Sequence, residues 1–181
     1  MLHRITDSVT ATLRDGRTVE IRSLHEEDAN AMLAFGTSLP ANDHLYLEDD
    51  LQSPDMIARL VYAYAAENWR QVVAVSELSE IVAYAAVRKL PGWSNHVGDV
   101  RLIVSDGWRG SGLGTTLGQA IFELARSLGV SKVIVEMLDA QYSGRTIFER
   151  LGFQIEGTFA DHARDRNGQH HKLLVLAYHV A

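Results

Sequence analysis

The chain has 181 residues, 46% of them hydrophobic, which suits a single folded domain over residues 1–181 with a sizeable core. Its formal net charge is −6 and it has no run of five Lys or Arg, which argues against nucleic acid or an anionic membrane as the main partner. Cysteine is absent, which excludes a disulfide framework, a thiolate metal site and a cysteine nucleophile. Met1 to Arg4 lack a signal-peptide core, and no stretch approaches the roughly 20 apolar residues of a membrane helix, so we expect a soluble cytoplasmic protein.

The N-terminal half predicts a hairpin, two helices and two strands. An Asp-Gly pair in the middle of residues 11–21 indicates the hairpin. Apolar spacing over residues 26–39 indicates an amphipathic helix with acids in its first turn. A Ser-Pro start indicates a second helix over 53–66, because Ser caps a helix and Pro suits its first position. Residues 71–77 and 81–89 have the composition of strands joined by a short polar loop.

The C-terminal half predicts four strands and two helices. Its clearest helix ends at Gly129 and has one apolar stripe, made of Leu113, Leu117, Ile121, Leu124 and Leu128. A shorter helix is expected to have Ser143 as its N-cap and to end at Gly152. The strands are expected at 97–104, 132–138, 154–159 and 171–179. With one crossover between neighbouring strands, this order predicts an α/β protein of the α+β type, with a mostly antiparallel sheet, one parallel pair and four helices.

The run Arg109-Gly110-Ser111-Gly112-Leu113-Gly114 lies between the strand at 97–104 and the longest helix. Its glycines let backbone N–H groups approach a ligand, and the unpaired N–H groups of the following helix favour an anion. An arginine at its start can bind a phosphate oxygen. A P-loop needs Lys after its last glycine, and a dinucleotide loop needs a different glycine spacing. The segment therefore indicates a phosphate-bearing cofactor of another kind.

This run resembles the Arg/Gln-x-x-Gly-x-Gly/Ala signature of the GNAT superfamily of acyl-CoA-dependent N-acyltransferases. The segment Ile147-Phe148-Glu149-Arg150-Leu151-Gly152-Phe153 is similar to the Leu-Tyr-Glu-Lys-Leu-Gly-Phe segment that ends the fourth helix of the same fold. The resemblance extends over residues 13–178. It implies a mixed sheet whose parallel pair splays apart to admit the cofactor.

The resemblance also implies which residues bind acetyl-CoA. The backbone of the strand before the glycine loop would pair with the pantetheine arm, and the loop would hold the diphosphate. A Gln stands where the family often has Asn, and a Phe stands where many members have the Tyr that protonates the leaving thiolate. The implied cofactor residues are Leu102, Ile103, Val104, Arg109, Gly110, Ser111, Gly112, Leu113, Gly114, Thr115, Gln141 and Phe148.

Acyl transfer to an amine needs a base, because an alkylammonium with a pKa of about 10.4 leaves only ~1 molecule in 10³ neutral at pH 7. By position in the family, Asp99 is the candidate base, and His96 is the alternative. Since Phe148 cannot donate a proton, Tyr142 is the candidate acid, with Ser143 beside it. Each of these could also be an ordinary surface residue.

Two other clusters have weaker implications. The loop 39–51 contains Asp43, Glu48, Asp49 and Asp50, which could select a cationic acceptor or could simply be solvated. The tandem pair His170-His171 points to opposite faces of a strand, so only one of the two could join His162, and we expect no metal site.

The leading hypothesis is an enzyme that moves an acetyl group from acetyl-CoA to a primary amine, in a small molecule or in a protein lysine or N-terminus, by direct attack in a ternary complex. Dimers are common in the family, so a homodimer is one option. The alternative is a module that binds acyl-CoA as a sensor without turnover. An NAD(P)-dependent oxidoreductase is disfavoured by the glycine spacing.

Overall fold

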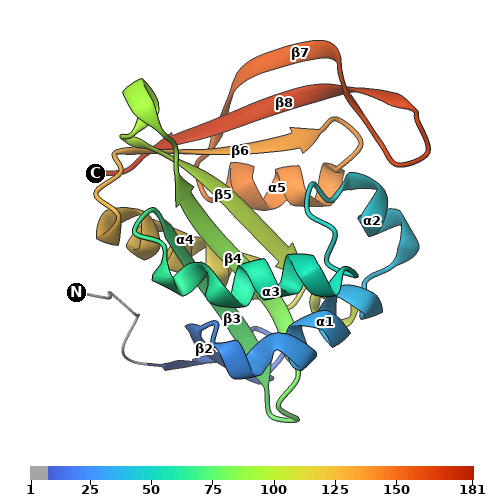
Figure 1. Cartoon of the computed structure of the whole chain (residues 1–181), viewed down its shortest axis with the longest axis vertical. Helices are drawn as coiled ribbons and strands as arrows, with labels where there is room; N and C mark the ends of the chain where they lie inside the picture. The colour runs from blue at the N-terminus through green and yellow to red at the C-terminus, as the bar shows by residue number, and fades with distance from the viewer. Residues whose placement is uncertain (1–7) are drawn as a thin grey trace.

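The computed structural model describes residues 8–181, so the expectation about Met1 to Arg4 lies outside the described part. The described chain forms one eight-stranded sheet in the order β1-β2-β3-β4-β5-β6-β8-β7 (Figure 1). The strands are β1 (Val9–Thr12), β2 (Thr18–Ser23), β3 (Trp69–Ser76), β4 (Ile81–Lys89), β5 (Val97–Val104), β6 (Lys132–Leu138), β7 (Gln154–Arg164) and β8 (His170–His179). The α-helices are α1 (Ala29–Ser38), α2 (Ala41–Tyr46), α3 (Pro54–Tyr62), α4 (Leu113–Ser127) and α5 (Tyr142–Arg150). In this part of the chain, no helix is long and apolar enough to span a bilayer.

Neighbouring strands of the sheet are antiparallel except for β5 and β6, which confirms the predicted mixed sheet with one parallel pair. The two parallel strands pair only at their starts, where Val97 to Asp99 face Lys132 to Ile134. Beyond that point β5 continues to Val104 and β6 to Leu138 without pairing to each other. The predicted splay is therefore present.

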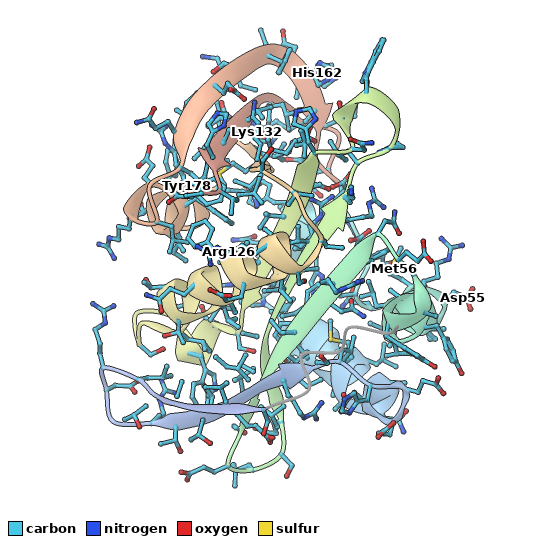
Figure 2. The ribbon with its side chains drawn as sticks, turned by 90° about the vertical axis from the view of Figure 1, so that its left-hand side faces the viewer. Asp55, Met56, Arg126, Lys132, His162 and Tyr178 are labelled. Carbon is cyan, nitrogen blue, oxygen red and sulfur yellow. The ribbon has the colours of Figure 1, made fainter. Side chains whose placement is uncertain are left out.

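Helices cover both faces of the sheet. The predicted apolar stripe of α4 is buried, and it packs with Val100 and Val133 in the core on one face. On the other face, Met32 of α1 and Leu60 of α3 pack around Tyr84 of β4. Figure 2 shows α4 and α3 on opposite sides of the sheet. The two apolar layers hold β5 between them and so fix the position of the glycine loop that follows it.

All four expected helices are present, and the loop 39–51 contains an additional helix, α2. With six residues, α2 is too short to show a hydrophobic period. The first helix also begins later than predicted. Residues Glu26–Asp28 form a separate 3₁₀ turn before α1, and Asp28 bonds to Arg22 at 2.7 Å and to the backbone N–H of His25 at 2.8 Å.

The last third of the chain differs from prediction at two boundaries. Helix α5 begins at Tyr142, so its N-cap is Gln141 and not Ser143. Strand β7 runs to Arg164, five residues beyond the predicted end, and crosses an irregularity before it pairs with the start of β8. Most β7 side chains are exposed, so the strand lacks the alternation by which a half-buried strand is detected.

Candidate active site

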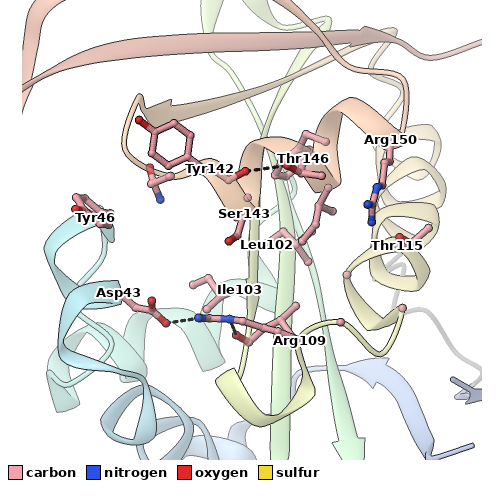
Figure 3. Close-up of a pocket in the computed structure, with 18 of the residues that line it drawn as sticks. Asp43, Tyr46, Leu102, Ile103, Arg109, Thr115, Tyr142, Ser143, Thr146 and Arg150 are labelled. Atoms are coloured by element: carbon pink, nitrogen blue, oxygen red, sulfur yellow. Dashed lines mark hydrogen bonds and ion pairs between the residues drawn. The ribbon is translucent and has the colours of Figure 1, made fainter. Parts of the chain in front are cut away.

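A cavity of about 570 Å³ opens where β5 and β6 separate. Its walls come from α2, the second half of β5, the glycine loop with the start of α4, and α5 (Figure 3). The predicted cofactor residues that line it are Leu102, Ile103, Val104, Arg109, Gly110, Gly112, Gly114, Thr115, Gln141 and Phe148. Ten residues predicted from separate motifs thus meet around one space.

The β5 wall of the cavity has a backbone edge that, within residues 8–181, pairs with no neighbouring strand. On its other side, residues Leu102 to Val104 pair with Ala83 to Ala85 of β4. On the β6 side, the strand pairing has already ended at Asp99. Backbone groups at an open edge are costly to leave unpaired, and an extended ligand can satisfy them as an added strand would. A linear chain with amide groups therefore suits this wall.

The glycine loop has a backbone conformation that side chains would obstruct. Gly110 and Gly112 have φ of 73° and 91°, in the left-handed region that glycine adopts readily. A Cβ at Gly114 would lie 2.9 Å from the Cδ1 of Ile147. Among residues 8–181, no acceptor is bonded to the N–H groups of Gly114 and Thr115, in the first turn of α4. A bare loop with open N–H groups at a helix N-terminus fits a diphosphate.

Two of the predicted cofactor residues do not line the cavity. Ser111 is buried, its hydroxyl donating to the carbonyl of Trp108 at 2.6 Å and accepting from the N–H of Leu113 at 3.3 Å. Leu113 is fully buried in the core beneath the loop. Their side chains therefore hold the loop in shape, and the N–H of Leu113 is already bonded within the loop.

Arg109 was expected to offer its charge to the cofactor, but in the structure its guanidinium already has partners. It donates to the carbonyl of Val104 at 3.2 Å and to the carboxylate of Asp106 at 3.2 Å. A third bond joins it to Asp43 of α2 (Figure 3). Arg109 thus ties the glycine loop to α2 across one side of the cavity. Sequence analysis missed this contact because Asp43 and Arg109 lie 66 positions apart.

The opposite wall of the cavity is formed by helix α5 and by Gln141, the residue before it. Gln141 accepts the N–H of Leu138 at 2.7 Å through its side-chain oxygen, so that atom closes the turn after β6. The Tyr142 side chain is 73% exposed and lines the cavity together with Ser143. Phe148 is buried against Phe153, at 5.0 Å between ring centroids, and forms part of the floor. Tyr142 and Ser143 are therefore the hydroxyl-bearing residues at the start of α5 on this wall, where Phe148 has no group to donate.

Asp99 does not line the cavity but lies beside it, at the last position of β5 that pairs with β6. Its carboxylate accepts from Arg101 at 2.9 Å, and Arg101 also pairs with Glu48. Burial raises the pKa of Asp99, and the charge of Glu48 raises it further, against the opposing effect of Arg101. Because alternate strand residues share a face, Asp99 and Arg101 are on the same face as the cavity residue Ile103. The raised pKa brings this carboxylate closer to the range of a general base.

One carboxylate near Asp99 was not predicted from the sequence. Burial raises the pKa of Glu136 on β6, and the charges of Asp99 and Glu48 add to the effect. No motif marks Glu136, since its proximity to Asp99 follows only from the parallel pairing of the two strands. The alternative base, His96, is exposed and does not contribute to the cavity lining.

Among the histidines named in the sequence analysis, His171 has a structural role. His171 is buried between two carboxylates, with Asp165 at 2.8 Å from one ring nitrogen and Asp139 at 3.3 Å from the other. The hydrogen bond between His171 and the Asp165 carboxylate raises the pKa of His171, and the same bond lowers the pKa of Asp165. Over residues 8–181, no group of three or more His, Asp or Glu could hold a metal ion.

Comparison with known proteins gives a consistent result. Residues 33–153 match the sequence model of the acetyltransferase (GNAT) family. The chain is 30% identical over 96 residues to N-acetyltransferase family 8 member 2 of Rattus norvegicus, covering 53% of this chain and 40% of that protein. It is also 30% identical over 97 residues to the L-methionine sulfoximine/L-methionine sulfone acetyltransferase of Pseudomonas paraeruginosa, covering 52% and 56%. The chain thus spans about half the length of these curated relatives.

Solved structures show the same fold at lower identity. The GNAT domain of S. lividans PAT aligns with a TM-score of 0.82 at 19% identity, covering 95% of this chain and 96% of the other. Spermidine N-acetyltransferase from Vibrio cholerae, in complex with CoA and spermine, aligns with a TM-score of 0.74 at 16% identity, covering 90% and 95%. The matched family model covers more than half of the chain, and the splayed sheet and glycine loop agree with it. The chain therefore belongs to the acetyltransferase (GNAT) family.

Proposed function

We propose that this protein transfers the acetyl group of acetyl-CoA to a primary amine. The observation that carries the proposal is the open backbone edge of β5, which runs from the separation of β5 and β6 to the glycine loop. A thioester arm with amide groups suits the edge, and a diphosphate suits the loop at its end. Acetyl-CoA has both parts and supplies an activated acetyl group.

The binding residues act chiefly through their backbone. Leu102, Ile103 and Val104 would hydrogen-bond the pantetheine arm, and the N–H groups of Gly110 to Thr115 would hold the diphosphate. Phe148 would pack against the arm, as its buried apolar ring allows. The Arg14 and Ile147 side chains already pack closely on Gly112 and Gly114, where an added Cβ would lie 3.0 Å and 2.9 Å from them.

Asp99 is the proposed general base. A charged ammonium has no lone pair for attack on the thioester carbonyl, so a proton must leave it first. Asp99 lies beside the cavity, and its raised pKa makes it a better proton acceptor than an exposed carboxylate. It accepts the proton directly or through one water molecule.

Tyr142 is the proposed proton donor to the departing thiolate. Tyr142, the first residue of α5, is among the residues that line the cavity, and Ser143 beside it offers a second hydroxyl. A thiol with a pKa of about 8.5 is a fair leaving group without help. The contribution of Tyr142 is therefore expected to be smaller than that of Asp99.

The charges beside the cavity favour a cationic acceptor. The charge of Glu48 raises the pKa of both Asp99 and Glu136, the charge of Asp99 adds to the pKa of Glu136, and Arg101 is the cation bonded to Asp99 and Glu48. An ammonium entering along this face would relieve their repulsion. One similar enzyme is named for L-methionine sulfoximine, and the spermidine N-acetyltransferase structure contains spermine; both molecules carry amines and suit this class.

The test is release of CoA thiol from acetyl-CoA with a panel of acceptors, including amino acids, diamines and lysine peptides. The proposal predicts acceptor-dependent release above the hydrolysis background, with the acetyl group recovered on nitrogen by mass spectrometry. Tight CoA binding by calorimetry, together with background release for every acceptor, would contradict it and favour the sensor alternative.

A further inference from the structure

Three arginines line the cavity of a chain whose net charge is −6. They come from separate segments: Arg14 from the turn between β1 and β2, Arg109 from the glycine loop, and Arg150 from the end of α5. A diphosphate held by loop N–H groups needs fewer cations than this. The arrangement therefore indicates that the ligand carries an additional phosphate.

The three side chains differ in what they already bind. Arg109 is bonded to Asp43 and Asp106. In the described part of the chain, neither Arg14 nor Arg150 has a carboxylate within ion-pair distance. The neighbour of Arg150 on α5, Glu149, instead pairs with Arg145 at 2.8 Å. Arg14 and Arg150 are thus the cavity arginines whose charge is available to a ligand.

These two arginines occupy different places around the loop. Arg14 lies over the glycines, because a Cβ built at Gly112 would meet its Nε at 3.0 Å. Arg150 projects from the last turn of α5 toward Thr115 in the first turn of α4 (Figure 3). Tyr142 and Arg150 are eight residues apart on α5, roughly 12 Å along its axis, so Arg150 lies far from the thioester end of the cavity.

We propose that Arg150 recognises the 3′-phosphate of coenzyme A, while Arg14 covers the diphosphate. This inference rests on the proposed function. Beyond the diphosphate, the cofactor continues to a ribose with a phosphate monoester, which carries close to two negative charges at neutral pH. A planar guanidinium binds such a group through two parallel hydrogen bonds. The site therefore distinguishes coenzyme A from its 3′-dephospho form.

The experiment measures Kd by calorimetry for CoA and for 3′-dephospho-CoA with four proteins: wild type, Arg150→Ala, Arg14→Ala and Arg145→Ala. Arg145 is the matched control, an arginine of the same helix that is paired outside the cavity. Arg150 is exposed, so its substitution leaves the core intact, and thermal melts check the fold. Arg150→Lys keeps the positive charge and removes the planar guanidinium that can donate two parallel hydrogen bonds.

We expect wild type to bind CoA at least roughly tenfold more tightly than dephospho-CoA, at low salt where exposed charges are least screened. Arg150→Ala should lose that preference, with CoA weakened by about tenfold or more and dephospho-CoA within twofold. Arg14→Ala should weaken both ligands equally, Arg150→Lys should lie between wild type and Arg150→Ala, and Arg145→Ala should weaken neither.

Equal weakening of the two ligands by Arg150→Ala, or no weakening, would overturn the assignment of Arg150. Equal binding of the two ligands by wild type would overturn it as well and leave the proposed function intact. Failure of wild type to bind either ligand would overturn both. The outcomes for the inference and for the proposed function are therefore separable.

Discussion

Replacement of Gly110 by alanine tests the glycine loop with a single methyl group. Gly110 has φ of 73°, and no atom of residues 8–181 lies within 4 Å of a Cβ built on it. Gly129, after the C-terminal end of α4, has φ of 67° and equally open surroundings. Gly110 lines the cavity and Gly129 does not. Gly129→Ala is therefore a control with similar backbone strain, at the end of α4 opposite the glycine loop.

The expected losses of stability and of CoA affinity follow from the positive φ of both glycines and from the position of Gly110 in the cavity. A non-glycine residue in the left-handed region costs about 1–2 kcal/mol, so both variants should lose that much stability. For a chain of this size, each kcal/mol lowers Tm by roughly 2–4 °C. In Gly110→Ala the methyl also occupies space where N–H groups would meet the diphosphate. Losing one hydrogen bond to a charged group costs about 1.5–3 kcal/mol, or roughly ten- to 150-fold in CoA affinity.

The assay pairs thermal melts with calorimetry of CoA binding for both variants. The account predicts similar losses of Tm and a loss of CoA affinity in Gly110→Ala alone. If folded Gly110→Ala binds CoA as tightly as Gly129→Ala does, the loop is not the diphosphate site, and the reasoning from its backbone is refuted.

Four further predictions concern the walls of the cavity. Asp99→Asn should lower kcat by about 10²–10⁴-fold with CoA affinity within twofold, and normal turnover would exclude Asp99 as the base. Glu48→Gln should move the acidic limb of the kcat/KM profile to lower pH, because the charge of Glu48 raises the pKa of Asp99 and its removal keeps Asp99 ionised at lower pH; an unmoved limb would contradict this. Asp43→Asn should strengthen CoA binding a few-fold at low salt by releasing Arg109, with a smaller effect at high salt, whereas weaker binding would show that the ion pair is needed. Tyr142→Phe should lower kcat by less than about tenfold, and a larger loss would make the phenol indispensable.

Local signals in the sequence predicted most of the fold. Ser53 caps α3 as expected, accepting from the N–H of Met56 at 3.4 Å. Gly129 and Gly152, predicted to end two helices, both have positive φ, at 67° and 95°. These features depend on near neighbours in the chain, which is why they can be identified without a structure. Helix α2 and the end of β7 lack such signals and were missed.

The parts of the candidate site that are formed by local backbone were predicted from the sequence. The contacts between side chains that lie far apart in the sequence were missed. The glycine loop and the edge of β5 follow from a contiguous motif and its flanking strand. The bond between Asp43 and Arg109 and the proximity of Glu136 to Asp99 depend on how α2 and β6 pack against the sheet. Arg14 and Arg150 stood in the sequence motifs, but only the cavity shows that they share a wall with the loop.

The most direct test of the central claim is a crystal structure of the protein with bound CoA. The account predicts the pantetheine arm hydrogen-bonded to the backbone of Leu102 to Val104, in the space where β5 and β6 separate, and the diphosphate on the N–H groups of Gly110 to Thr115. Electron density for CoA elsewhere on the protein, with that space filled by water, would contradict it.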